Sequence, residues 1–456
     1  MLDNRVKKLV QDCEMQIVGH KIFVRMKDIP MYLSKKTRDS IRNRYSHSIE
    51  VGLSTEYILD ALSCNLKHFV NLNFFNVGKI VGLVHDIGHT AFSHSGEVIL
   101  DNALKKASRA LGVEIRFDAN INNFRRIEKY RLFAPLPKRV KKYALASLLK
   151  RPNELKKYPE YLYLQEYLKE AIAIEEDYLN KNGIKFKNRV GKTVLNQAMD
   201  LADENRYRVT DIIDSLNIYS KVELSEILQE MIKSEVTLKE ISKYAYIDKD
   251  IYKTLLDKKV KNITIKELLI TLLHKESHAK TEFQNLMNSI SMAFNRNVYL
   301  KEDGAVEFIN ANIEALREDF KKIGAKYIWG SKKVQRIRNQ YIHYFKDVVN
   351  YFLFNNYNID FIDSTTYANA LKSLKSKNLN PKEKRVKELM LLRNFLGGLT
   401  NPKIMQLYKL IELEKFEKKY GLKIQDKKRD KLIHKTSIKE FKKSLDKYKD
   451  SLKVFV

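Results

Sequence analysis

Apolar residues recur every three to four positions along almost the whole chain, and strict alternation of apolar and polar residues is scarce. This spacing gathers apolar side chains on one stripe of an α-helix, whereas a half-buried strand needs a two-residue period. Helix breakers are also rare, with 15 glycines and 7 prolines in 456 residues. No repeat of about 20–50 residues stands out, which argues against a solenoid. The pattern therefore predicts an all-α fold.

The periodicity predicts individual helices in the first half of the chain. They cover residues 44–62, 77–85, 96–111, 117–130, 141–150, 161–180 and 193–219. Ahead of them, residues 1–36 read as a short helix and an extended entry segment, in which residues 18–24 and the turn at Pro30 form a small strand pair.

Charged amphipathic helices follow residue 221, separated by loop signals at Asp303-Gly304, Gly330-Ser331, residues 378–381 and Gly397-Gly398. The lysine-rich stretch 416–456 is either a solvated pair of terminal helices, which we favour, or a basic arm.

The composition is that of a soluble globular protein, with 44% hydrophobic and 31% charged residues. No apolar run reaches the roughly 18 residues of a membrane span, and the N-terminus lacks the features of a signal peptide. The two cysteines, Cys13 and Cys64, favour a reducing compartment without a disulfide framework. We therefore expect a cytoplasmic protein that does not enter membranes.

The chain carries a large excess of positive charge. Its 85 basic and 56 acidic residues give a net charge of +29. Such an excess favours phosphorylated partners, either nucleotides or nucleic acids, without choosing between them.

One stretch, residues 84–97, holds three of the ten histidines together with an aspartate and a glutamate. It follows the apolar segment 80–84, which predicts that these polar groups are carried into the interior. An unpaired polar group costs roughly 2–7 kcal/mol to bury, and a charge costs more. A bound metal ion would compensate this cost. The alternative is a capped helix end whose histidines bond to backbone carbonyls.

Further ligands for such an ion occur elsewhere in the sequence. His85 and Asp86 are adjacent, and His47 lies on the apolar face of the preceding predicted helix. Asp203, Tyr207 and Asp211 are spaced four residues apart, so they form one polar stripe on a helix that also has core-like positions at Leu195, Met199, Ile212 and Leu216.

The predicted ligands are thus two imidazoles and two carboxylates around one metal ion, from His47, His85, Asp86 and Asp203. This set suits Mn²⁺, Fe²⁺ or Zn²⁺ better than Mg²⁺, and we expect Mn²⁺ first. His89 and His94 remain as proton donors or phosphate ligands, and Glu97 could hold one of these imidazoles in its cationic form.

These residues carry a family resemblance. His47, His85-Asp86 and Asp203 match the H…HD…D pattern of the HD-domain phosphohydrolases, and the longer matches resemble the deoxynucleoside triphosphate (dNTP) triphosphohydrolases of the bacterial dGTPase type. The matching segments are residues 44–51, 85–97, 117–125 and 202–211, with a weaker echo at 394–401. The resemblance spans roughly residues 35–410 and implies an HD-domain helical core with additional C-terminal helices.

The resemblance implies hydrolysis of a dNTP, such as dGTP or several dNTPs, to deoxynucleoside and inorganic triphosphate, with a water activated at the metal as nucleophile. His94, supported by Glu97, would protonate the leaving 5′ oxygen, and His89 would contact a phosphate oxygen. The implied substrate contacts come from Arg44, Asn120, Arg125, Lys150, Tyr207 and Asp211. The arginines would neutralise phosphate charge, the tyrosine would stack under the deoxyribose, and Asp211 would accept from its 3′-hydroxyl. An alternative for Lys150 is a helix-terminal lysine that stabilises the helix dipole.

Two positions depart from the family pattern. Many relatives have a histidine where this chain has Ala119, which puts more weight on His89, His94 and Glu97 or implies slower chemistry. Asn401 stands where relatives usually have an aspartate, so no role is assigned to it.

The domain prediction follows from these assignments. Residues 1–220 would form the catalytic core with an N-terminal extension, and residues 221–456 would complete the substrate pocket and build the interface of a homo-oligomer. A nucleotide or single-stranded nucleic acid as effector stays open. Two other functions also stay open: an HD-type nucleotidase or phosphodiesterase acting on mono- or cyclic nucleotides, and a basic nucleic-acid-binding helical protein with a structural metal.

Overall fold

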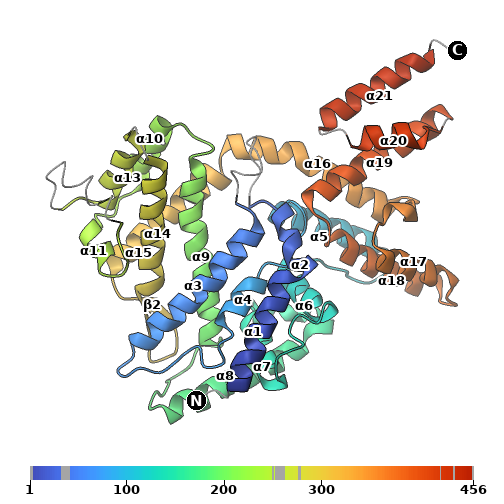
Figure 1. Ribbon diagram of the computed structural model, residues 1–456. Helices are drawn as coiled ribbons and strands as arrows, with labels where there is room; N and C mark the ends of the chain where they lie inside the picture. The colour runs from blue at the N-terminus through green and yellow to red at the C-terminus, as the bar shows by residue number, and fades with distance from the viewer. Residues whose placement is uncertain are drawn as a thin grey trace. The chain divides into compact units, whose positions relative to one another are not determined.

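The fold is known from a computed structural model that describes residues 4–31, 42–248, 251, 262–275, 279–421, 423–434 and 437–453. Helices account for nearly all regular structure in these residues (Figure 1). The only strands among them are β1 (Val298–Leu300) and β2 (Val306–Phe308), which pair antiparallel. The prediction of an all-α fold is confirmed. None of the described helices combines the length and apolar character that a membrane span requires.

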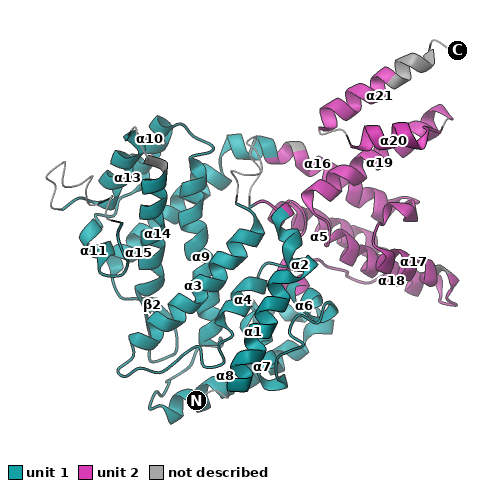
Figure 2. Ribbon diagram, viewed as in Figure 1, with its two compact units in different colours: residues 1–27, 31–87, 123–337 teal, residues 28–30, 88–122, 338–456 magenta. Residues whose placement is uncertain are grey.

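The chain divides into two compact units (Figure 2). Unit 1 contains residues 1–27, 31–87 and 123–337, and unit 2 contains residues 28–30, 88–122 and 338–456. Two helices, α6 (Ala119–Lys129) and α16 (Lys332–Phe354), run from one unit into the other. The predicted domain boundary near residue 221 lies inside unit 1, so the division into compact units does not coincide with it. The functional division at that point stays a prediction.

Unit 1 is built around helix α9 (Val194–Ser215), which packs against α3 (Arg44–Cys64), α4 (Gly78–Val84) and α14 (Ala279–Arg296). The other helices of this unit are α1 (Asn4–Gly19), α2 (Lys21–Val24), α7 (Lys138–Ser147), α8 (Tyr163–Lys181), α10 (Lys221–Met231), α11 (Leu238–Ser242), α13 (Ile265–His274) and α15 (Ala311–Ile323). A π-helical turn, η5 (Gly324–Trp329), follows α15, and shorter 3₁₀ turns are η1 (Arg25–Asp28), η3 (Pro152–Lys157) and η4 (Pro159–Tyr161).

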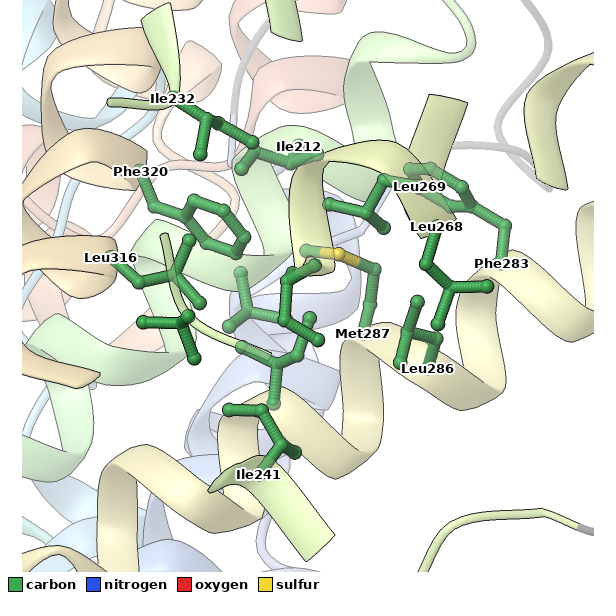
Figure 3. Packing of buried hydrophobic residues seen from close by; sticks show 14 of the residues in the cluster. Ile212, Ile232, Ile241, Leu268, Leu269, Phe283, Leu286, Met287, Leu316 and Phe320 are labelled. Carbon is green, nitrogen blue, oxygen red and sulfur yellow. The ribbon is translucent and has the colours of Figure 1, made fainter. Parts of the chain in front are cut away.

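The C-terminal half of α9 also anchors a large apolar cluster with helices α10 to α15 (Figure 3). Ile212 from α9 meets Leu316 and Phe320 from α15, while Leu269 and Met287 come from α13 and α14. These side chains are fully buried. Because α9 belongs both to this core and to the contact with α3 and α4, its polar stripe is held on a rigid support.

Helices α3 and α4 approach each other closely through two glycines. A Cβ atom added at Gly82 would lie 2.6 Å from the Cα of Gly52, and one added at Gly52 would lie 3.0 Å from the carbonyl oxygen of Lys79. Only glycine leaves room for this approach, so the backbones can pack with no side chain between them. The contact brings the N-terminal part of α3 toward the end of α4.

Unit 2 contains α5 (Ser93–Arg109), α17 (Thr365–Ser376), α18 (Pro381–Leu396), α19 (Asn401–Tyr420), α20 (Asp426–Ile433) and α21 (Ile438–Lys453), with a 3₁₀ turn η6 (Ile359–Phe361). Helix α5 packs against α18. The last three helices share a small core of Leu413, Ile424, Leu432 and Phe441. The described part of the lysine-rich C-terminal stretch is therefore helical with a buried seam, as expected for solvated helices rather than an arm.

The strand pair expected at residues 18–24 is wrong. Those residues finish α1 and form α2, and the side chain of His20 caps α2 by accepting from the backbone amide of Ile22 at 3.1 Å. A short apolar run fits either a strand or a helix. Here Ile17, Ile22 and Phe23 are buried with helical spacing, and the local cap favours the helix. The strands occur instead around the loop signal at Asp303-Gly304, which is the turn of the β1–β2 hairpin.

Every helix predicted between residues 44 and 219 is present, with shifts at some ends. Helix α5 begins at Ser93 rather than near Gly96, which places His94 in its first turn. Helix α7 ends at Ser147, so Lys150 lies beyond the helix and not on its last turn. Both shifts affect residues of the candidate site.

Candidate metal centre

Three helices of unit 1 bring the predicted metal ligands together. His47 lies in the first turn of α3, which starts where the Asn43 side chain accepts from the backbone amide of Ser46 at 3.0 Å. His85 is the C-terminal cap of α4, and Asp203 lies in the middle of α9. All three side chains are buried. Neighbouring residues within a helix point in different directions. His85 and Asp86 can both face the same region because α4 ends there.

The ligand atoms form a compact group. The candidate ligand atoms of His47, His85 and Asp203 all lie within 4.8 Å of one another. Nε2 of His47 lies 2.9 Å from Oδ1 of Asp203, and Nε2 of His85 lies 3.4 Å from the same oxygen. Asp86 adds a carboxylate whose Oδ1 is 3.5 Å from Nε2 of His85. Three of the four predicted ligands therefore form one compact group, and Asp86 lies next to it beside His85.

The hydrogen bonding of His85 bears on whether this set fits a metal ion. Its Nδ1 lies 2.6 Å from the carbonyl oxygen of Gly82, which can only accept, so Nδ1 carries a proton. The other nitrogen, Nε2, is buried and has no hydrogen-bond partner among the described residues. In a neutral imidazole it would present a lone pair to the oxygens of Asp86 and Asp203, which is repulsive unless a cation lies between them. This donor set fits a divalent transition metal.

The pKa shifts of these residues agree with a negatively charged site. Burial alone lowers the pKa of both histidines, and the pKa of His47 stays lowered. For His85, the carboxylates of Asp86 and Asp203 outweigh burial and raise the pKa. Burial opposes ionisation of Asp203, yet Lys150 and His85 hold the pKa of its carboxyl well below the usual range. The site thus keeps its carboxylate charged.

Two of the cations predicted to contact phosphate, Arg44 and Lys150, form ion pairs with predicted metal ligands. Arg44, which is buried, donates to Oδ2 of Asp86, and the same nitrogen lies 3.5 Å from the hydroxyl of Tyr207. Nζ of Lys150 donates to Oδ2 of Asp203 at 2.7 Å. The sequence contains no signal for the second pairing, because Lys150 and Asp203 meet only when α7 packs beside α9. Contacts of these cations with a substrate stay a prediction.

The rest of the α9 stripe extends from the ligands. The ring of half-buried Tyr207 lies 4.6 Å from the ring of His47. Asp211 is buried, and its Oδ2 accepts from Nε1 of Trp329 at 2.9 Å. Burial raises the pKa of Asp211 to about 7. The three polar residues of the stripe are therefore inside the unit and not on its solvated surface.

The other two histidines of the predicted site, His89 and His94, form a second cluster with Glu97, and this cluster belongs to unit 2. Candidate ligand atoms of His89, His94 and Glu97 lie within 4.8 Å of one another. Nδ1 of His94 is 3.4 Å from Oε2 of Glu97, and the rings of His89 and His94 are 4.9 Å apart. His89 is buried, whereas His94 is exposed. Burial opposes the charge of Glu97, but His94, His89 and the amide of Ala119 lower its pKa.

The segment that departs from the family pattern contacts this second cluster. The backbone amide of Ala119 donates to Oε1 of Glu97 at 2.7 Å, so this position orients the glutamate even without a histidine side chain. Asn120 is half-buried in the first turn of α6. Arg125, further along α6, pairs with Glu160 at 3.0 Å and lies over the ring of Tyr161. Its contact with phosphate stays a prediction.

Two supporting residues, Asn123 and Asn401, were given no role by the sequence analysis. Asn123 is buried, and its side chain donates to the carbonyl oxygen of His85, which fixes the end of α4. In unit 2, Oδ1 of Asn401 accepts from the backbone amide of Phe92 at 2.9 Å. Phe92 has a left-handed backbone with φ of 60°, a conformation that costs energy for a side chain of this size. Asn401 therefore stabilises the turn before α5.

Comparison with known proteins agrees with these motifs. No protein-family model matches the chain. The chain is 28% identical over 233 residues to "Deoxyguanosinetriphosphate triphosphohydrolase-like protein 2" of Vibrio cholerae, covering 49% of this chain and 48% of that protein. It is 27% identical over 235 residues to the protein of the same name from Mesorhizobium japonicum, covering 44% of each. A "Deoxyguanosinetriphosphate triphosphohydrolase-like protein" of Wolinella succinogenes is 36% identical over 91 residues, 20% of this chain and 21% of that protein.

The chain spans about half, or less, of the length of the curated relatives it matches. These relatives come from distant bacteria and share one family name. Over about half of its length or less, the chain is thus similar in sequence to deoxyguanosinetriphosphate triphosphohydrolase-like proteins.

Proposed function

We propose that this protein is a metal-dependent hydrolase that converts a dNTP to deoxynucleoside and inorganic triphosphate. The observation that carries the proposal is the buried nitrogen Nε2 of His85. It faces the carboxylates of Asp86 and Asp203 without a hydrogen-bond partner among the described residues, beside His47. The names of the relatives support the substrate class.

The metal would be held by His47, His85, Asp86 and Asp203, with Mn²⁺ as first choice and Fe²⁺, Zn²⁺ or Mg²⁺ as alternatives. When bound, it supplies Lewis acidity to a phosphoryl oxygen. The protein's own groups prepare the site. Gly82 fixes the tautomer of His85, and Lys150 keeps Asp203 ionised. Orientation of this kind by neighbouring groups is typical of metal ligands.

The cations beside the ligands suit a polyphosphate. Arg44 and Lys150 are each paired with a carboxylate ligand, so a metal ion that takes over those carboxylates leaves both cations available for phosphate oxygens. A guanidinium fork matches the geometry of phosphate. A monophosphate would need fewer such groups, which favours the triphosphate over a mono- or cyclic nucleotide.

The leaving group needs a proton. In the proposed reaction a water oxygen bonds to the α-phosphorus and the bond from that phosphorus to the 5′ oxygen breaks. We assign protonation of the 5′ oxygen to His94, held by Glu97, and a phosphate contact to His89. The pair fits this role because the lowered pKa of Glu97 keeps its carboxylate charged, and this carboxylate lies 3.4 Å from Nδ1 of His94, where it can orient the ring.

Product analysis tests the function. Incubation with each of the four dNTPs and Mn²⁺, followed by ion-exchange chromatography, should yield deoxynucleoside and triphosphate in equal amounts. Mono- and cyclic nucleotides serve as competing substrates in the same assay. Pyrophosphate or orthophosphate as the first product, or faster turnover of a mono- or cyclic nucleotide, would contradict the proposal. A requirement for a second nucleotide would establish an effector.

A second candidate function, binding of single-stranded nucleic acid, is favoured by a groove on unit 1. The groove holds about 780 Å³, and its lining includes Tyr57, Tyr244, Tyr246, Lys243 and Arg296. Tyr57 and Tyr246 are 44% and 70% exposed, so their rings are accessible for stacking. Aromatic rings that stack bases beside cations that contact phosphates are the usual means of binding single strands.

Cys64 lines the same groove and is exposed, whereas the chain's other cysteine, Cys13, is buried. Alkylation of Cys64 by a maleimide should therefore slow several-fold in the presence of a thymine oligonucleotide at low salt. Raising the salt concentration should remove the protection, because counterion release weakens such binding. Tyr246→Ala should reduce the protection, and Tyr219→Ala, away from the groove, serves as the control. Unchanged alkylation at saturating oligonucleotide would exclude this candidate.

A further inference from the structure

A polar network lies one helical turn beyond the candidate metal ligands of α3 and α9. Glu50 comes three residues after His47 on α3. Arg206 comes three residues after Asp203 on α9. Residues three apart lie on nearly the same face of a helix. The facing ligands on these two helices are therefore followed, in the same direction on both, by a carboxylate and a guanidinium.

The two groups form an ion pair between the helices. Nη2 of Arg206 lies 2.8 Å from Oε2 of Glu50, and Nε of Arg206 donates to the same oxygen at 3.2 Å. Nη1 of Arg206 donates to the hydroxyl of Ser291 on α14 at 3.0 Å, and this serine is buried. The Arg206 side chain itself is only 11% exposed. One guanidinium thus joins α3, α9 and α14, which pack against one another in pairs (Figure 1).

The carboxylate of Glu50 is also held from its other side. Nε of Arg42 lies 3.5 Å from Oε1 of Glu50, so each oxygen of the carboxylate faces a different arginine. Burial alone would raise the pKa of Glu50, but Arg206 and Arg42 outweigh burial and lower this pKa. Glu50 therefore keeps its charge. Because charge-assisted hydrogen bonds from a rigid guanidinium allow few arrangements, the pair sets the separation of the helices.

The separation of α3 and α9 matters because two candidate ligands face each other across it. Nε2 of His47 and Oδ1 of Asp203 are 2.9 Å apart. The ion pair lies about one turn away, roughly 4.5 Å along the helix axes. Functional sites need their groups held within roughly 0.5 Å of the working geometry by surrounding packing and hydrogen bonds. A link so close to the ligands controls their spacing more directly than distant contacts do.

We propose that Glu50 and Arg206 are positioning residues that fix the separation of α3 and α9, so that the ligands on these helices are set for a metal ion before it binds. The inference rests on the proposed function for the presence of that ion. It extends the site beyond the ligands, since neither residue is assigned a contact with the ion or with the nucleotide. The pair should therefore act on metal affinity and leave the chemical step nearly unchanged.

Arg206→Met tests this, because it removes the charge and the hydrogen bonds but keeps a long unbranched side chain. The Mn²⁺ affinity of the protein, measured by titration without nucleotide, should fall about tenfold. A fall of this size follows if the fraction of molecules with correctly spaced ligands drops by the same factor. At saturating Mn²⁺ the rate of dNTP hydrolysis should stay within about threefold of the wild-type rate.

Further variants separate the ion pair from a general loss of packing. Arg206→Lys restores a cation opposite Glu50 and should keep the Mn²⁺ affinity within about threefold of the wild type. Glu50→Gln should lower the affinity about tenfold. The protein with both Glu50→Gln and Arg206→Met should bind Mn²⁺ no more weakly than the worse single variant, since the two changes remove one shared interaction.

Glu14→Gln is the matched control. Oε1 of Glu14 lies 2.5 Å from Nζ of Lys79, and this pair joins α1 to the first turn of α4, at the opposite end of α4 from His85. The Glu14 side chain is 27% exposed, against 26% for Glu50. The control should lose a similar amount of stability, read from the denaturant midpoint of metal-free protein, and keep the Mn²⁺ affinity. Unchanged affinity in Arg206→Met, or an equal loss in Glu14→Gln, would overturn the inference.

The outcomes also separate this inference from the proposed reaction. If Mn²⁺ binds and Arg206→Met weakens its binding, but dNTPs are not hydrolysed, the reaction fails and the positioning pair stands. If the wild type hydrolyses dNTPs and all variants bind Mn²⁺ equally well, the positioning pair fails and the reaction stands. Absence of Mn²⁺ binding by the wild type would contradict both.

Discussion

Replacing Asp203 by asparagine should lower dNTP hydrolysis more than about 100-fold. Changes to residues that only orient metal ligands already cost about 10–100-fold in activity or metal affinity, and Asp203 is itself a candidate ligand. Its Oδ1 is the oxygen nearest to both histidines, at 2.9 Å from His47 and 3.4 Å from His85. Asparagine keeps the size of the side chain but removes the negative charge. Steady-state rates and the metal content after gel filtration measure the effect.

Asp200→Asn is the matched control, because Asp200 lies one turn earlier on α9 and 3.8 Å from Lys150, without belonging to the group of ligand atoms. It should retain the activity within about threefold and the bound metal. Equal activity of Asp203→Asn and wild type would remove the metal centre from the proposed mechanism. Equal unfolding temperatures of the two variants would show that the loss is one of chemistry and not of folding.

The sequence alone was sufficient to predict the helices between residues 44 and 219 and the residue types of the candidate metal centre. Helical periodicity predicted every helix between residues 44 and 219, because each has to bury one stripe of apolar side chains. It also predicted that His47, His85 and Asp203 meet, although Asp203 is more than a hundred residues from the other two. That inference depended on polar residues placed on apolar faces, where burial without a partner is costly.

Pairings that depend on packing were beyond the sequence. Lys150 was expected to contact phosphate or a helix dipole, but it pairs with Asp203 because α7 ends early and leaves the lysine beside α9. The donor to Asp211 is 118 residues away in a π-helical turn that no periodicity indicates. Residues 18–24 were assigned to strands, since a short apolar run fits either structure. Local caps and long-range partners decide such cases.

The packing of α9 explains why the compact units do not divide near residue 221. A cut near residue 221 looked natural because the specific motifs stop there, yet α9 shares one apolar cluster with helices α10 to α15. A helix that contributes to two faces of a core cannot be separated from either. Residues 221–337 therefore remain in the unit that holds the metal centre, and mutations in them should affect that centre through α9.

Gly82→Ala should lower the free energy of unfolding by about 1–3 kcal/mol, the usual cost of overpacking. The new methyl group would lie 2.6 Å from the Cα and 2.9 Å from the amide nitrogen of Gly52, which are backbone atoms that cannot rotate away. Because α3 and α4 must separate, His47 and His85 should move apart and metal affinity should fall about tenfold or more. Denaturant unfolding and metal titration measure the two effects.

Gly19→Ala is the control, since nothing lies within 4 Å of the added carbon and the residue ends α1 with an ordinary backbone. It should leave metal affinity unchanged and stability unchanged or slightly higher, because alanine favours the helix. Unaltered metal affinity in Gly82→Ala, together with a loss of stability, would mean that the ligands adjust independently of the helix spacing. A parallel loss of both would show that the approach of two glycines sets the geometry of the metal centre.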